Sequence, residues 1–286
     1  MNNLKNLESK SIFILREAKS RFKNPAILWS IGKDSTTLLW LCRKAFYGKV
    51  PFKVLHIDTG YKFKEIYDFR DKYAKEWGLD LAISKNKDAD KFGITPEKGR
   101  FACCNARKTE ALKKAVKEYG FDSLLVGIRR DEHGIRGKER YFSPRARDGE
   151  WKISKQKELS NIHENDSDIM SLQDAELSGW NIFATDFGYD IDHVRVHPLL
   201  HWTEQDIWEY IKLENLPFTS LYISDNGKRY RSIGCEPCCI QVASDAKNVT
   251  EIVDELNLNK AGEREGRAQD KENDHNMQML RSLGYM

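Results

Sequence analysis

The chain is 286 residues long, 40% of its residues are hydrophobic and 32% are charged, and its formal net charge is +3. This length can bury one large core or one domain with an appended module, and the mixed composition excludes disorder throughout the chain. The small net charge does not by itself imply nucleic-acid binding, although a local basic cluster could still bind phosphates.

The first 22 residues have acidic side chains among the apolar ones and contain no long apolar stretch. They therefore predict neither a signal peptide nor a membrane span, and we expect a cytoplasmic protein with no membrane partner. Their apolar residues recur at helical spacing, which predicts an amphipathic helix over residues 4–23 that ends at Pro25.

Short apolar strands then alternate with helices. Strands are predicted over residues 26–29, 54–57, 81–84 and 123–128, and helices after residue 35, over 65–77 and over 106–119. This alternation predicts an α/β, Rossmann-like fold, in which helices cover both faces of a mainly parallel central sheet.

Residues 143–192 break the alternation, because they are polar and acidic without a regular period, and we interpret them as a mobile insertion or lid. The segment VRVHPLLHWTEQDIWEYI then predicts a strand, a turn and a helix capped by Thr203, with Asp206 in a near capping box. We divide the chain into a core domain over residues 1–215 and an extension over residues 216–286, which holds a cysteine-containing loop and a charged C-terminal segment.

A polar loop, SIGKDS, lies between the first predicted strand and the following helix. Backbone N–H groups and the dipole at a helix start favour an anion, so pyrophosphate would fit here. The loop is not a Walker A sequence, because the long spacing before Gly-Lys-Ser/Thr is missing, and an ordinary strand-to-helix turn is the alternative. The residues expected to bind ATP in this loop are Ser30, Ile31, Gly32, Lys33, Asp34 and Ser35.

The loop resembles the PP-loop, SGGxDS, of the adenine nucleotide α-hydrolase superfamily, with Ile31 in the place of the first glycine. The next strand ends in DTG, and open parallel sheets bind ligands at the carboxyl ends of their strands. We therefore add Asp58 and Gly60 to the ATP site, with Asp58 as a candidate to hold Mg²⁺ or a nucleotide hydroxyl. Capping of the following helix is the alternative for Asp58.

Further blocks, in the same order, resemble the small subunit of sulfate adenylyltransferase, among them LHIDTGYKFKEIYDFRDKYAKEWG, KTEALKKAVKEYGFD, GIRRDEHGIRGKER and GEREGRAQDK. The resemblance covers most of the chain. It implies a PP-loop ATP pyrophosphatase that cleaves ATP between its α- and β-phosphates and adenylylates sulfate. It also implies a GTPase large subunit as partner, and a homo-oligomer is compatible with the sequence.

Basic residues follow the strand predicted over residues 123–128. Arg129, Arg130 and Arg136 are candidates to bind the substrate anion or the α-phosphate, where transition-state charge develops. Together with the loop, they make Lys33, Arg129 and Arg130 the expected catalytic residues. Lys138 and Arg140 are further candidates, for which a solvated basic loop is the alternative.

His197 and His201 flank the later strand-to-helix turn. Imidazole can act as a general acid or base near neutrality. Attack by an already anionic substrate needs no base, so we expect both histidines to pack and to form hydrogen bonds.

Four cysteines form two pairs, Cys103 with Cys104 and Cys235 with Cys238, and Cys239 is adjacent to the second pair. In a chain without a secretion signal such pairs are more typical of metal or redox sites than of disulfides. They resemble the Cys-Cys and Cys-x-x-Cys pairs of adenylylsulfate reductases with clusters, so we expect a [4Fe–4S] cluster, with zinc as the alternative. A reversible disulfide and reduced thiols without a role are further alternatives.

The cysteines support a second hypothesis, because adenylylation of sulfate needs no thiol. A thiolation enzyme would adenylylate a tRNA base, a DNA phosphate or a purine and insert sulfur from a cysteine desulfurase, with Cys239 as the candidate sulfur carrier. A sulfonucleotide reductase fits less well. Those enzymes use a nucleophilic cysteine near the C-terminus, and residues 240–286 contain no cysteine. A non-catalytic nucleotide-binding scaffold would leave the loop and arginines at the strand ends unexplained.

Overall fold

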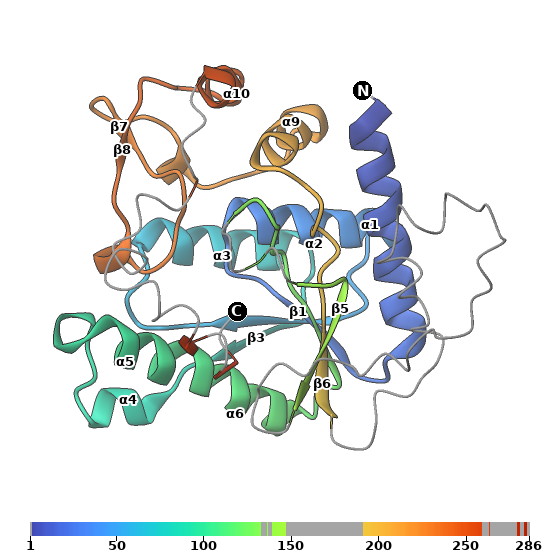
Figure 1. Cartoon of the computed structure of the whole chain (residues 1–286), viewed down its shortest axis with the longest axis vertical. Coiled ribbons are helices and arrows are strands. Elements are labelled where there is room, and N and C mark those ends of the chain that lie inside the picture. The colour runs from blue at the N-terminus through green and yellow to red at the C-terminus, as the bar shows by residue number, and fades with distance from the viewer. Residues whose placement is uncertain are drawn as a thin grey trace, which may run out of the picture.

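The computed structural model describes residues 2–132, 136, 139–146, 191–258, 263, 279–280 and 283–284. Its centre is a six-stranded sheet with the order β3-β2-β1-β4-β6-β5 (Figure 1). The strands are β1 (Pro25–Leu28), β2 (Lys53–Ile57), β3 (Leu81–Ser84), β4 (Ser123–Leu125), β5 (Phe142–Ala146) and β6 (Ile191–Val196). Neighbouring strands are parallel except β5 and β6, which run antiparallel. The strand order reverses beside β1, and ligands of open parallel sheets bind at such a switch point.

Helices cover both faces of the sheet (Figure 1). One face carries α1 (Asn2–Arg21), α2 (Lys33–Ala45), α3 (Lys64–Glu76) and α9 (Glu204–Glu214). The other carries α4 (Lys87–Lys91), α5 (Arg100–Cys104) and α6 (Glu110–Tyr119), and a π-helical turn, η2 (Asn105–Thr109), joins α5 to α6.

Each face has its own apolar core because successive strand side chains point to opposite sides. Ile27 and Val54 pack with the helices of the α2 layer, whereas Leu28 and Leu55 pack with those of α6. The predicted α/β architecture is therefore confirmed. Within the described residues, no helix is both long and apolar enough to cross a lipid bilayer.

The predicted start of α9 is also present. The hydroxyl of Thr203 accepts the N–H of Asp206 at 3.1 Å, and the Asp206 carboxylate accepts the N–H of Thr203 at 2.9 Å. This reciprocal capping box satisfies two backbone donors that would otherwise lack partners at the helix start.

The bounds predicted for the insertion were wrong. Phe142–Ala146 and Ile191–Val196 are paired strands of the central sheet, so residues 143–146 and 191–192 belong to this sheet. The predicted mobile insertion itself falls on residues 147–190, which lie outside the described residues. The division at residue 215 stays a prediction, since α10 (Val249–Leu258) and Tyr222 of the extension pack into the same core as α2 and α9.

Three buried histidines lead us to expect a loss of stability in acid. Burial lowers the pKa of His56, His193 and His197 to about 4, below the ordinary histidine value. The unfolded chain takes up these protons first, so their stabilising contribution is present above about pH 6.5 and is lost as the pH falls toward 4. We expect the free energy of unfolding to fall by about 2 kcal/mol per histidine between pH 7.5 and pH 5. Urea unfolding at both pH values measures this change.

The variant His197→Gln provides the control for this expectation, because His197 lies in the core and its Nδ1 donates to the carbonyl of Arg140 at 2.6 Å. It should be less stable than the wild type at pH 7.5, yet lose about 2 kcal/mol less on acidification. An unchanged pH dependence in this variant would contradict the assignment.

Candidate functional site

The loop between β1 and α2 presents the open start of a helix. Gly32 is the N-cap of α2 and supplies no side-chain hydrogen bond to its first turn. The hydroxyls of Ser30 and Ser35 lie 3.0 Å apart, and the Ser35 hydroxyl donates to the carbonyl of Gly32 at 3.1 Å. Both serines therefore stand at the end of the helix where N–H groups attract an anion.

Ile31 is unusual in this loop, because its φ is +66°. A β-branched residue rarely adopts this left-handed conformation, which glycine adopts without a steric cost. The side chain is buried among the apolar core residues, so packing holds the strained backbone in place. The departure from SGGxDS thus keeps the backbone shape that a glycine would provide.

Gly127, just beyond β4, lets two segments approach the same point. A Cβ atom at this position would lie 3.1 Å from the carbonyl oxygen of Asp34 and from the backbone of Ser35. Because these are backbone atoms of the first turn of α2, they cannot move aside easily. The absence of a side chain at Gly127 therefore sets the distance between β4 and the loop.

A pocket opens where the strand ends meet the loop. It encloses about 970 Å³ of space, its open mouth included. Its apolar lining comes from the ends of three adjacent strands and the residues just after them: Leu28, Leu55, Ile57, Val126 and Ile128. Its polar lining includes Ser30, Gly32, Lys33, Asp34 and Ser35. An apolar slot beside a helix start suits a flat base joined to phosphates.

Lys33 is buried in a network of ion pairs at the loop. Its ammonium group binds the Glu263 carboxylate and lies 3.5 Å from Asp34 and 3.9 Å from Glu204. Burial would lower the pKa of Lys33, but these carboxylates outweigh it and raise the pKa well above the ordinary lysine value. Lys33 therefore stays charged at any physiological pH.

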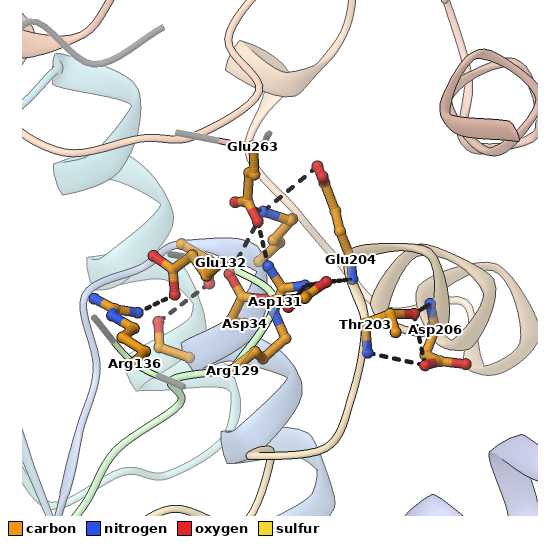
Figure 2. Close-up of polar contacts among 12 residues, drawn as sticks. Asp34, Arg129, Asp131, Glu132, Arg136, Thr203, Glu204, Asp206 and Glu263 are labelled. Carbon is orange, nitrogen blue, oxygen red and sulfur yellow. Dashed lines mark hydrogen bonds and ion pairs between the residues drawn. The ribbon is translucent and has the colours of Figure 1, made fainter. Parts of the chain in front are cut away.

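Arg129 belongs to the same network (Figure 2). Its guanidinium binds Glu263 and lies 2.8 Å from Asp34 and 3.3 Å from Asp131. Burial raises the pKa of Asp34, although Arg129 and Lys33 act in the opposite direction. Glu263 thus lies between Lys33 and Arg129 and neutralises positive charge that an anionic ligand would otherwise neutralise.

Tyr222 closes the loop from the side of the extension. Its hydroxyl accepts the backbone N–H of Lys33 at 3.0 Å, and its ring lines the pocket. The N–H of Lys33 is one of the donors that a phosphate would use, so the tyrosine hydroxyl stands in for a ligand oxygen.

The predicted arginines separate in the structure. Arg136 lines the pocket and forms an ion pair with Glu132, which also lines it (Figure 2). Arg130 lies elsewhere: its guanidinium is 2.7 Å from Nε2 of His201 and donates to the carbonyl of Glu139 at 2.9 Å. These donors serve the β4–β5 connection and the segment after β6, and the expected catalytic and anion-binding role of Arg130 stays a prediction. Lys138 lies outside the described residues.

Asp58 and Gly60 form a turn. The Asp58 carboxylate accepts the N–H of Gly60 and the hydroxyl of Tyr67, each at 2.8 Å. Burial would raise the pKa of Asp58, but these two hydrogen bonds lower it overall. Among the described residues, Ile57, Thr59 and Lys62 form the pocket wall after β2. In the described part of the chain the pocket lining includes Thr59 but neither Asp58 nor Gly60, and their expected contact with ATP stays a prediction. Asp58 does not cap α3, whose N-cap is Phe63.

The two cysteine pairs come together beside the pocket. Cys103, Cys104, Cys235 and Cys238 are all buried free thiols. Burial, together with the neighbouring Cys104, Cys235 and Cys238, raises the pKa of Cys103 to about 11. Segments more than a hundred residues apart in sequence thus bring four thiols within electrostatic reach of one another.

Three residues that line the pocket also adjoin these thiols. The hydroxyl of Thr59 is 3.2 Å from the Sγ of Cys235, and the N–H of Gly234 donates to the Sγ of Cys239 at 3.0 Å. The charge of Lys108 acts on Cys238. The thiols therefore form part of the surroundings of the pocket.

Three functional candidates were missing from the sequence interpretation: Glu204, Tyr222 and Glu263. Glu263 lies in GEREGRAQDK, whose family resemblance was the available signal, although nothing local connects it with Lys33. Glu204 follows Thr203, so the capping box alone explained an acidic residue there. Tyr222 lies in a 3₁₀ turn with no motif of its own.

Comparisons with known proteins place these features in context. Residues 24–241 match the family model of the phosphoadenosine phosphosulfate reductase domain. The chain is 38% identical over its full length to sulfate adenylyltransferase subunit 2 of Shigella dysenteriae, covering 98% of that protein. It is 36% identical to the protein of the same name from Proteus mirabilis, again over 100% of this chain and 98% of the relative.

Solved structures with the same fold are more distant in sequence. A phosphoadenylyl-sulfate reductase from Candida auris has a TM-score of 0.53 at 20% identity, covering 83% of this chain and 96% of that one. The FMN adenylyltransferase of Candida glabrata in complex with ATP has a TM-score of 0.54 at 16% identity, covering 84% of this chain and 63% of that one. At these identities the likeness establishes a shared fold.

Proposed function

The chain belongs to the family of sulfate adenylyltransferase subunit 2, within the phosphoadenosine phosphosulfate reductase domain family, and we propose that it transfers the adenylyl group of ATP to sulfate. A sulfate oxygen attacks the α-phosphorus, the bond from that phosphorus to the oxygen bridging to the β-phosphate breaks, and pyrophosphate leaves. The observation that carries the proposal is the pocket, which joins an apolar slot to a helix start with a buried lysine.

In this proposal the base of ATP occupies the slot between Leu28, Leu55 and Val126, and the phosphates reach the loop. Lys33, Ser30 and Ser35 bind the leaving pyrophosphate, where negative charge increases during the reaction. Arg129 holds Asp34 and Glu263 in place and so positions the loop, while Arg136 is the arginine candidate beside the α-phosphate. Bound Mg²⁺ would supply further positive charge on the phosphate oxygens, which are its usual ligands.

The proposed partner is a second subunit of sulfate adenylyltransferase. We propose a GTPase for that subunit, because adenylylsulfate formation is unfavourable and needs an energy source. Association with a second copy of this chain remains compatible with the proposal.

Pyrophosphate release from ATP tests this function directly. Anaerobically purified full-length protein, with the GTPase subunit of a close relative added, should release pyrophosphate at a rate that rises with sulfate and saturates. Adenylylsulfate should form in equal amount. Release that is indifferent to sulfate, but rises with a cysteine desulfurase and a nucleic acid, would replace this function by the thiolation alternative.

The thiols favour a [4Fe–4S] cluster as an additional group. We propose Cys103, Cys104, Cys235 and Cys238 as its ligands, because all four are buried and interact electrostatically with one another. In the described part of the chain, no three cysteines, histidines or acids are close enough to share a single metal ion. The two cysteine pairs supply the four thiolates that such a cluster needs, and a zinc ion bound by the same four ligands stays the alternative.

The charges around the thiols also fit an anionic cluster. Arg107 acts on Cys103, and Lys108 and Arg100 act on Cys238, each favouring the thiolate form. Because Thr59 contacts Cys235, Gly234 contacts Cys239 and both residues line the pocket, thiolation is the second candidate function. Cys239 would then be the sulfur carrier, since it is less buried than the other four.

A further inference from the structure

Two lysines line the pocket on a wall that the phosphate loop does not form. Lys62 follows β2, and Lys108 belongs to the π-helical turn η2. Both side chains are half-buried. Lys33 and Ser35, by contrast, start α2 after β1. The pocket therefore has one set of cations and donors at the helix start and a second set on the side of β2 and η2.

Arg107 fixes these two lysines relative to each other. Its buried guanidinium donates to the carbonyl of Thr59 at 3.2 Å and lies 4.9 Å from the ring centroid of Tyr61. It thereby ties η2 to the segment that leads into Lys62. In the widened π-helical turn, Arg107 faces this segment while the adjacent Lys108 reaches the pocket. Such turns are often found at functional sites.

Lys62 exerts its charge inside the protein. Burial and the positive charge of Lys62 both lower the pKa of His56, which falls to about 4.

We propose that Lys62 and Lys108 bind the attacking sulfate, an assignment that rests on the proposed adenylylation. In-line displacement requires the nucleophile to approach the α-phosphorus from the side opposite the leaving pyrophosphate. The leaving group belongs at the start of α2, so the nucleophile needs a different wall. Two ammonium groups match the charge of a dianion and offset its repulsion from ATP.

Two other cations that line the pocket, Lys33 and Arg136, interact with carboxylates. Lys33 is surrounded by Asp34, Glu204 and Glu263, and Arg136 pairs with Glu132. These carboxylates would repel a second anion brought to the same side. Sulfate bound by Lys62 and Lys108 would instead approach from the wall after β2 and at η2, which these carboxylates do not form.

Steady-state kinetics with Lys62→Met and Lys108→Met test the assignment. Each variant should raise the KM for sulfate about tenfold or more, the usual effect of losing a charged hydrogen-bond partner. The KM for ATP should change less than about twofold, because the phosphate loop is intact. Lys62→Arg and Lys108→Arg should recover part of the sulfate affinity. Lys64→Met is the matched control, since this lysine lies two positions away, is 86% exposed and pairs with Asp68.

The outcomes separate this inference from the proposed function. Sulfate-dependent release in the wild type, with an unchanged sulfate KM in both methionine variants, would overturn the lysine site alone. Parallel increases in the KM values for sulfate and ATP would also overturn it, because they indicate a distorted pocket. A wild-type protein that ignores sulfate would remove both proposals together.

Discussion

Replacing Lys33 with methionine should lower the rate of pyrophosphate release by at least about 100-fold, the usual cost of losing one group that stabilises the transition state. The expected loss exceeds that of a single contact. Without the ammonium group, Asp34, Glu204 and Glu263 would keep only their arginine partners, so the site would carry one more net negative charge beside the incoming phosphates. Single-turnover release with saturating sulfate measures the chemical step, and ATP binding is measured separately.

A second substitution distinguishes lost catalysis from misfolding. Glu263→Gln in the Lys33→Met background removes one of the excess carboxylates, so the double variant should bind ATP more tightly than Lys33→Met while remaining slow. Lys44→Met is the matched control, since Lys44 lies on the same helix and pairs with Glu8 and Glu214 away from the pocket. Near-normal release from Lys33→Met would remove the loop from the mechanism.

Local sequence patterns predicted most of the fold, because the helices and strands that they favour are also the ones that tertiary packing stabilises in this protein. The strand over residues 81–84 and the cap at Thr203 occur as predicted. β5 was not predicted, because residues 143–146 fall in the segment that was interpreted as an insertion, yet they are buried and pair with β6. Strand formation there depends on the neighbouring strand rather than on intrinsic preference.

The site was predictable where its residues are contiguous. SIGKDS indicated the phosphate loop, and the two cysteine pairs indicated that four thiols could gather. Glu263 lies 230 positions from Lys33 and 134 from Arg129, so only the folded chain shows that it neutralises both. Arg129 and Arg130 are adjacent in sequence, and their opposite directions follow from the backbone after β4 rather than from residue type.

The substitution Cys238→Ala should abolish iron binding, from about four iron atoms per chain in the anaerobic wild type to below about one. Burial raises the pKa of Cys103 and Cys238, so without metal these thiols stay protonated at neutral pH. Metal binding must displace the protons from these thiols, which costs free energy. A cluster that lacks one thiolate loses the binding free energy of that ligand, which helps to offset this cost. Iron and zinc content, measured together on the same samples, report the result.

Cys42→Ala is the matched control for this prediction, because Cys42 is a buried thiol on α2 among apolar core residues and should leave the iron content unchanged. Zinc in place of iron in the wild type, or full iron in Cys238→Ala, would contradict the cluster. The iron-free variant also separates the two candidate functions. Sulfate-dependent pyrophosphate release that survives the loss of iron assigns the thiols to structure, whereas thiolation would require them for sulfur transfer after adenylylation.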